Sequence, residues 1–199
     1  MCLLLESIKI ANGQPQNLPW HQRRLDASRL EVFGVGLPPI NLLEVLDTSQ
    51  LDSTTIYKAR VIYGEQLNKV EIEPYSVRPI QSIRVVEANN LDYRHKYADR
   101  SAINMLFNGK GGADEILITR NSLLTDCSYA NVCFWDGSKW HTPAEPLLAG
   151  TKRASLLEKG LISERKIAVN DIKFFESVTL INAMLDPGTI VLPVSQLIC

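Results

Sequence analysis

Short strand-like segments, separated by turn residues, recur along this chain and alternate with a few helical patterns. Alternating or β-branched apolar residues mark these segments, and turn pairs such as Asn12-Gly13 and Asp136-Gly137 connect them. This pattern is typical of sheets that carry a few helices, so the sequence predicts an α+β fold. Strands are expected at residues 3–10, 54–63, 69–74, 115–119, 123–127, 132–135, 178–182 and 190–194.

Helical segments are fewer. Prolines near the start of the pattern favour helices at 19–33 and 41–46. Apolar residues at helical spacing predict a helix over 97–108 with one buried face, and a further helix after Gly150. The residues of the first apolar stripe are Ala98, Ala102, Met105 and Leu106, and those of the second are Ala154, Leu157 and Leu161.

A turn-like stretch at 88–90 separates a half rich in strand-like segments from a half that begins with a helix. We therefore expect two domains: a small N-terminal α+β domain at 1–88 and a larger C-terminal domain at 89–199.

Composition indicates the kind of partner. The 199 residues hold 21 Lys+Arg against 22 Asp+Glu, a formal net charge of −1, so no global field attracts a polyanion, and neither nucleic acid nor an anionic membrane is expected as a partner. Glu6 interrupts the only apolar run at the N-terminus, and no run approaches the length of a spanning helix. These features predict a cytoplasmic protein with a small-molecule partner.

Several catalytic templates are missing. The four cysteines form no CxxC pair, the three histidines show no metal-ligand spacing, and neither a GxSxG elbow nor a phosphate-binding glycine loop is present. We expect reduced thiols and no metal site. The run at 109–112 is interpreted as the turn that ends the preceding helix.

A series of segments does carry the parts of a pyridoxal phosphate site, which needs a lysine, an acid for the pyridine nitrogen and donors for the phosphate. In chain order they read HQRRL (21–25), YKARV (57–61), YRHKYADR (93–100), DEILIT with TDCSYANV (114–119 and 125–132), TP with LLAGTKR (142–143 and 147–153) and LINAM (180–184). Over almost the whole chain this series resembles the class IV aminotransferases, the fold-type IV pyridoxal phosphate enzymes.

The resemblance implies a fold, with a small N-terminal α/β domain and a larger domain built on a mixed sheet or pseudo-barrel, and it implies a homodimer. It also implies pyridoxal 5′-phosphate as the cofactor. Members of this family usually begin with one more strand than this chain has, so the chain is expected to be an N-terminally shortened member.

The resemblance also implies residue roles. Lys96 matches the lysine that carries the cofactor, and a position between a strand and a helix, beside Arg94 and His95, would lower its pKa. Arg24 matches the arginine that grips the phosphate, for which its planar fork is suited. Alternation in a strand puts Lys58 and Arg60 on one side, where they would bind a substrate carboxylate, or else simply face solvent.

The C-terminal half supplies the remaining positions. Asp126 stands where the family has the glutamate that pairs with the pyridine nitrogen; because aspartate is one methylene shorter, the ring would lie closer or a water would bridge the gap. Gly150, Thr151 and Lys152 match the helix start whose N–H groups bind phosphate, although Lys152 replaces a threonine. Asn182 would complete the phosphate site or serve only as a structural turn.

Within the family the chain is most similar to 4-amino-4-deoxychorismate lyase, which eliminates pyruvate to give 4-aminobenzoate, a folate precursor. The substrate would be a small acidic or amino-acid-like molecule. Two alternatives remain: an amino-acid transaminase of the branched-chain or D-amino-acid type, and a member without catalytic activity.

Overall fold

The computed structural model describes residues 2–198, and its contacts divide the chain into two compact units. The first unit holds residues 1–77 and 95–99, and the second holds 78–94 and 100–199. The division falls at 77/78 rather than at the expected 88/89, because the strand at Ile83–Glu87 pairs with a strand of the second unit. Residues 95–99 return to the first unit.

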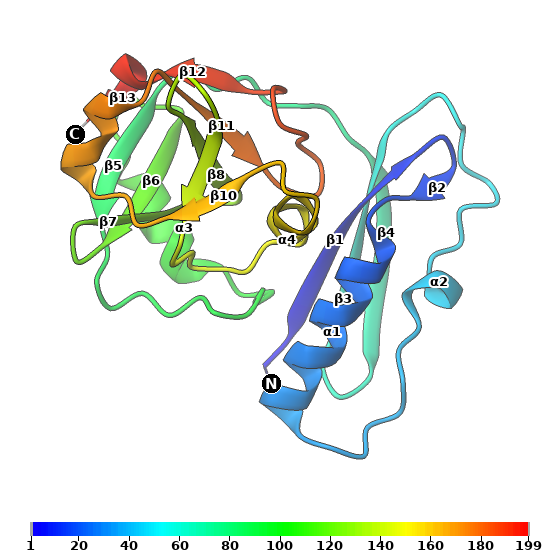
Figure 1. Ribbon diagram of the computed structural model, residues 1–199. Helices are drawn as coiled ribbons and strands as arrows, with labels where there is room; N and C mark the ends of the chain where they lie inside the picture. Colours follow the sequence, from blue (N-terminus) through cyan, green and yellow to red (C-terminus); the bar gives the residue numbers. More distant parts are fainter. Residues whose placement is uncertain (1, 199) are drawn as a thin grey trace. The chain divides into compact units, whose positions relative to one another are not determined.

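The first unit is a four-stranded antiparallel sheet in the order β2-β1-β3-β4 with a long helix on one face (Figure 1). The predicted strands and helices of this half are confirmed, with small shifts at their ends. The elements are β1 (Leu4–Ala11), β2 (Gln14–Pro15), α1 (Leu18–Phe33), α2 (Leu42–Val45), β3 (Tyr57–Tyr63) and β4 (Leu67–Pro74).

Alternation along β1 and β3 decides which side chains enter the core of the first unit. Even-numbered residues of β1 and the odd-numbered residues of β3 from Ala59 onward are buried, and Leu25 of α1 packs among them. The core residues are Leu4, Ile8, Ile10, Leu25, Ile40, Leu42, Leu46, Ala59, Val61 and Tyr63. One even-numbered residue of β1, Glu6, is charged and yet fully buried.

The helix expected at 97–108 begins later, at Ser101, and forms α3 (Ser101–Asn108). The residues before it are extended: the N–H of Leu5 donates to the carbonyl of Lys96 at 2.9 Å, and the N–H of Ala98 donates to Leu3 at 2.8 Å. These backbone groups are satisfied by Leu3 and by Leu5 of β1, so they are not available for a first helical turn. The expected buried face is also wrong, because Ile103 is the buried residue of α3 and Met105 is 75% exposed.

The second unit is built on a mixed sheet in the order β10-β9-β8-β7-β6-β5-β13, with β11 paired to β8 and β12 paired to β11. Three pairs, β5/β6, β5/β13 and β9/β10, are parallel and the others are antiparallel, as the mixed-sheet prediction requires. Its strands are β5 (Ile83–Glu87), β6 (Glu115–Arg120), β7 (Leu123–Cys127), β8 (Asn131–Trp135), β9 (Trp140–Pro143), β10 (Ser163–Arg165), β11 (Ser177–Ile181), β12 (Val191–Pro193) and β13 (Leu197–Ile198).

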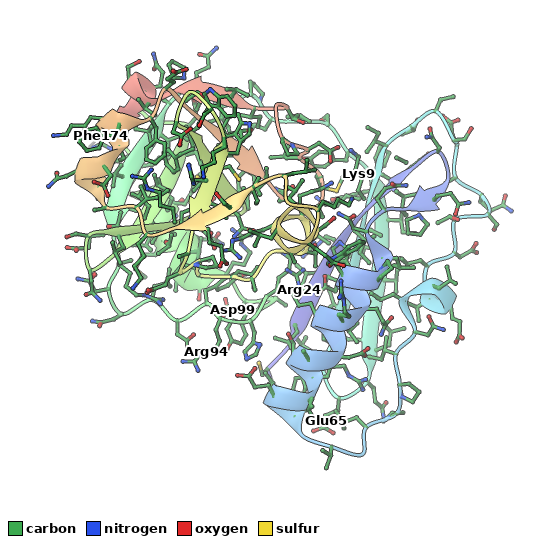
Figure 2. The ribbon with its side chains drawn as sticks, viewed as in Figure 1. Lys9, Arg24, Glu65, Arg94, Asp99 and Phe174 are labelled. Carbon is green, nitrogen blue, oxygen red and sulfur yellow. The ribbon has the colours of Figure 1, made fainter. Side chains whose placement is uncertain are left out.

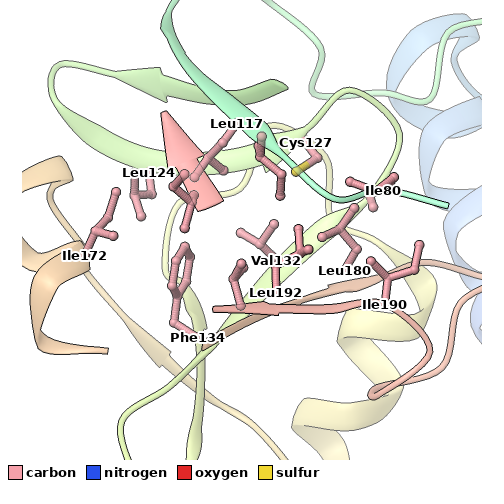
Figure 3. Packing of buried hydrophobic residues seen from close by; sticks show 14 of the residues in the cluster. Ile80, Leu117, Leu124, Cys127, Val132, Phe134, Ile172, Leu180, Ile190 and Leu192 are labelled. Atoms are coloured by element: carbon pink, nitrogen blue, oxygen red, sulfur yellow. The ribbon is translucent and has the colours of Figure 1, made fainter. Parts of the chain in front are cut away.

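Helices of the second unit are short: α3, α4 (Thr151–Glu158) and the 3₁₀ turns η1 (Val169–Phe174) and η2 (Val194–Gln196). The helix expected after Gly150 is present as α4, but it ends at Glu158, so Leu161 lies beyond it and is 60% exposed. The strands enclose an apolar core of their own (Figure 3). Labelled members of this core include Leu117, Leu124, Val132, Phe134, Leu180 and Leu192.

Two further expectations concern cysteines and membranes. Cys2, Cys127 and Cys133 are free thiols, and Cys199 lies outside the described residues. Between residues 2 and 198, no helix is both long and apolar enough to cross a bilayer.

Candidate active site

Lys96 is placed by a short antiparallel pairing with β1. Leu4 and Tyr97 form a bridge, flanked by the two backbone hydrogen bonds of Leu5 and Ala98. Tyr97 packs against the core of the first unit, and since neighbouring residues in an extended segment point to opposite faces, Lys96 points away from that core. The pairing holds the lysine backbone against the strand that also carries Glu6.

Arg24 projects from α1 toward β1 within the first unit (Figure 2). Its Nε donates to Oε1 of Glu6 at 2.8 Å and its Nη2 donates to Oε2 at 2.6 Å. His21, one turn earlier on α1, places Nδ1 2.5 Å from the same Oε2. The predicted phosphate-binding arginine is therefore part of a buried network of three residues.

Electrostatics keep Glu6 of this network ionised. Burial by itself raises the pKa of Glu6, but the charge of Arg24 and the hydrogen bonds of His21 and Arg24 outweigh it and hold that pKa at about 2. Burial lowers the pKa of His21, and the charges of Arg24 and Lys96 lower it further against the opposing effect of Glu6. Lys96 thus lies within electrostatic reach of His21.

Lys58 and Arg60 lie on the sheet face opposite the core, as the alternation of β3 predicts. The register puts Lys9 beside Lys58 and Ser7 beside Arg60 on this open face. Each cation also has a carboxylate partner on β4: Lys58 Nζ is 2.7 Å from Glu73, and Arg60 Nη1 is 3.2 Å from Glu71. The face therefore carries cations whose charge is partly balanced.

Asp126 is buried in the second unit and is held from two sides. Its Oδ1 accepts from Nδ2 of Asn131 at 2.7 Å, and its Oδ2 accepts from the N–H of Leu148 at 2.9 Å. Burial raises the pKa of Asp126 to about 6, although the bonds from Leu148 and Asn131 and the charge of Arg153 oppose the shift. A cationic N–H placed next to this carboxyl group would restore its ionised form.

Gly150, Thr151 and Lys152 form the start of α4, and no side chain caps the helix from Gly150. A Cβ at Gly150 would overlap Oδ1 of Asn131, so the glycine is required for the close approach of this turn to β8. The Nδ2 of Asn131 also donates to the carbonyl of Leu148 at 3.0 Å. Asn131 therefore joins the predicted acid to the predicted phosphate loop.

Lys152 and Asn182 take part in side-chain contacts of the second unit. Lys152 Nζ lies 2.5 Å from Oδ1 of Asp186, so the residue that replaces the family threonine forms an ion pair. Asn182 accepts from the N–H groups of Met184 and Leu185 and donates to the carbonyl of Tyr129 at 3.1 Å. Its side chain thus builds the turn at 182–185, which is the structural role left open by the sequence.

The predicted site residues form two groups. Lys96, Arg24, Lys58 and Arg60 belong to the first unit, whereas Asp126, Gly150, Thr151, Lys152 and Asn182 belong to the second. Two residues that organise these groups, Glu6 and Asn131, were not predicted as site residues. Glu6 had a signal, since it is a carboxylate at a core position between Leu4 and Ile8. The sequence signal for Asn131 was weaker, because its contact with Asp126 depends on the register between β7 and β8, which the sequence does not show.

The model of the family described as amino-transferase class IV matches residues 3–197. The chain belongs to the amino-transferase class IV family. An uncharacterized protein of Haemophilus influenzae is 37% identical to it over 182 residues, which cover 91% of this chain and 97% of the relative.

Solved structures agree with membership of the class IV family. A provisionally named 4-amino-4-deoxychorismate lyase from Haemophilus somnus is 33% identical, with a TM-score of 0.88 over 92% of this chain and 97% of that one. The pyridoxal-phosphate-bound form of a hypothetical aminotransferase from Mycobacterium tuberculosis has a TM-score of 0.79 at 16% identity, covering 98% of this chain and 81% of that one, and shows the shared fold. The fold-type IV prediction is confirmed, and the chain is an enzyme of a pyridoxal-phosphate-dependent family.

Residues of each unit suit a part of this cofactor. Asp126 is a buried acid whose raised pKa calls for a cationic partner such as a protonated pyridine nitrogen. α4 begins at Thr151, and backbone N–H groups at a helix start suit a phosphate. Lys96 supplies an amine near the Arg24 guanidinium network. Among residues 2–198, no group of His, Cys, Asp or Glu could hold a metal ion.

Proposed function

We propose that this class IV enzyme binds pyridoxal 5′-phosphate through Lys96 and acts as a 4-amino-4-deoxychorismate lyase. The observation that carries the cofactor assignment is the placement of Lys96, whose backbone is fixed on β1 next to the Glu6–His21–Arg24 network. The 33% identity to the Haemophilus somnus protein over nearly the full length of both chains supports the lyase assignment. The reaction would release pyruvate and 4-aminobenzoate.

Each side chain then has a defined task. Pyridoxal phosphate, when bound, supplies an electron sink that stabilises negative charge on the substrate carbon. The Lys96 amine would hold the cofactor and afterwards move a proton at the reacting carbon. Asp126, in its ionised form, would keep the pyridine nitrogen protonated. Arg24 and the amides of Thr151 and Lys152 would hold the phosphate, and Lys58 and Arg60 would bind the substrate carboxylates.

Visible absorption of the purified protein tests the cofactor assignment. After addition of pyridoxal phosphate, the wild-type protein should develop the absorption band of lysine-bound cofactor, and Lys96→Ala should not. Lys166→Ala is the matched control, because Lys166 is a surface lysine, 71% exposed, that pairs with Glu145. A wild-type protein that shows no band, or a band that survives in Lys96→Ala, would overturn the proposal.

A transaminase is the second candidate, favoured by the aminotransferases among the structural neighbours. The two activities use the same lysine and ring but differ in whether the amino group stays on the cofactor. A lyase should release pyruvate from 4-amino-4-deoxychorismate and leave the cofactor spectrum unchanged when only an amino donor is added. Conversion of the spectrum by a branched-chain or D-amino acid would favour the transaminase. A protein that binds cofactor and shows neither reaction would be an inactive member.

We further propose that the enzyme is a cytoplasmic homodimer. The free thiols of Cys2, Cys127 and Cys133 support a reducing compartment. The homodimer is what the resemblance to the class IV family implies. Light scattering coupled to size-exclusion chromatography measures the mass directly, and a monomer at every concentration tested would contradict the dimer.

A further inference from the structure

Glu6 is a charged side chain in an apolar position. It lies on the core face of β1 between Leu4 and Ile8, and none of its surface is exposed. A buried carboxylate is costly unless cations and donors surround it, and a simple core position here would be filled by an apolar residue. The contacts of Glu6 therefore indicate what the charge accomplishes.

Both carboxylate oxygens of Glu6 are committed to α1. Oε1 accepts from Arg24 Nε at 2.8 Å and Oε2 accepts from Arg24 Nη2 at 2.6 Å, so the two parallel bonds fix the plane of the guanidinium. Nδ1 of His21 lies 2.5 Å from Oε2 and holds the carboxylate in turn.

Arg24 is only 14% exposed, whereas Glu6 and His21 are fully buried. The network therefore runs from the interior of the first unit to a guanidinium near its surface. A flexible arginine loses rotamer entropy when it binds a ligand, and one that is already held in place loses less. The arrangement suits recognition of a planar or tetrahedral oxyanion.

We propose that Glu6 is a positioning residue for phosphate: it presents the Arg24 guanidinium to the phosphate ester of the cofactor, with His21 holding the carboxylate. This inference rests on the proposed function, because the phosphate ester is that of pyridoxal phosphate. Glu6 touches neither cofactor nor substrate and acts through Arg24.

A merely structural ion pair would have a different signature. If Glu6 only held α1 on the sheet, its loss would weaken every ligand of the site to the same degree. If Glu6 positions Arg24, its loss would weaken ligands that carry a phosphate and spare those that lack one. Pyridoxal and pyridoxal phosphate differ only in this group.

The experiment measures the affinity of the cofactor-free protein for both compounds by absorbance titration. Glu6→Gln should weaken pyridoxal phosphate about tenfold or more and leave pyridoxal within about twofold of wild type. Asp26→Asn is the matched control, since Asp26 lies on the exposed side of α1 and accepts from Gln22. It should change neither affinity.

A double-mutant cycle shows whether Glu6 works through Arg24. Arg24→Lys keeps the charge but loses the fork, so Glu6→Gln should have little further effect on phosphate affinity in that background. If Glu6→Gln does not fold, as judged by circular dichroism, Glu6→Asp replaces it: the shortened carboxylate cannot hold both nitrogens and should show a smaller loss confined to the phosphate compound.

The outcomes are distinct. Equal weakening of both compounds by Glu6→Gln, or no weakening of either, would overturn the positioning role and leave the proposed function intact. A wild-type protein that binds neither compound would overturn the proposed function and this inference with it.

Discussion

Two buried carboxylates in this enzyme have pKa values shifted in opposite directions. Glu6 is surrounded by Arg24 and His21, so its pKa is held at about 2 despite burial. Asp126 accepts hydrogen bonds from amide groups, and burial outweighs them, so its pKa rises to about 6. The difference is typical of a structural charge and of an acid prepared for a cationic ligand.

The raised pKa of Asp126 predicts a pH-dependent stability. The protonated form is favoured in the folded, cofactor-free protein, so the stabilising contribution is fully present below the unfolded value of 3.8 and is lost as the pH rises through about 6. Relative to Asp126→Asn, the wild-type protein should lose roughly 3 kcal/mol between about pH 3 and pH 8. Urea unfolding at a series of pH values measures this difference.

Asp114→Asn is the control, because hydrogen bonds from Gln81 and Ser82 lower the pKa of Asp114 and place its titration well below pH 6. The difference in free energy of unfolding between Asp114→Asn and wild type should not depend on pH above about pH 5. If the unfolding free energies of wild type and Asp126→Asn differ by the same amount at every pH, the raised pKa of Asp126 is contradicted.

At the scale of elements, a buried histidine joins three pieces of the second unit. His141 of β9 places Nε2 2.7 Å from Asp136, in the turn between β8 and β9, and Nδ1 3.0 Å from the hydroxyl of Ser163 on the edge strand β10. Asp136 also accepts from the backbone of Ser138 and Lys139, so it builds the hairpin turn. The trio links a hairpin to a sheet edge.

Replacing His141 with phenylalanine should leave two polar partners without their bond. We expect His141→Phe to destabilise the enzyme by about 1–3 kcal/mol, because the Asp136 carboxylate and the Ser163 hydroxyl lose a buried partner. Ser163→Ala removes a single bond and should cost less. Urea denaturation measures which variant loses more stability. Hydrogen exchange of His141→Phe should show the largest loss of protection in β10. Equal costs for both variants would argue against the linking role.

At the scale of the molecule, each unit has an apolar core, and these two cores share no residue among those that the structure describes. It passes between the units at 77/78, 94/95 and 99/100, so segments of the sequence interleave although the cores do not. The passage at 94/95 brings Lys96 into the first unit, and the passage at 99/100 returns the chain to the second unit, to which α3 belongs.

Separate cores predict additive effects. Leu25→Ala in the first core and Phe134→Ala in the second should each cost roughly 3–5 kcal/mol, since both side chains are fully buried. Because the two clusters have no common member, the double variant should lose the sum of the single losses within about 0.5 kcal/mol. Calorimetry of the four proteins measures this, and a coupling larger than about 1 kcal/mol would contradict independent cores.

Local patterns in the sequence determined most of the strands, the long helix α1 and the order of the class IV motifs. Alternation predicted that Lys58 and Arg60 share the open face of β3, because side chains in a strand follow its two-residue period wherever it packs. Helical spacing was a poorer guide at 97–108, where Ala102 and Met105 are exposed and Ile103 is buried.

Only the tertiary structure decided how distant segments satisfy one another. Residues 96–98 are extended because Leu3 and Leu5 accept and donate their backbone hydrogen bonds, and a single-sequence pattern does not contain those partners. The pairing of Glu6 with Arg24, and of Asp126 with Asn131 and Leu148, likewise depends on which chain segments meet. The sequence by itself determined which chemical groups are present and in what order. The long-range pairing of strands and the requirement that buried charges be neutralised decided where those groups lie.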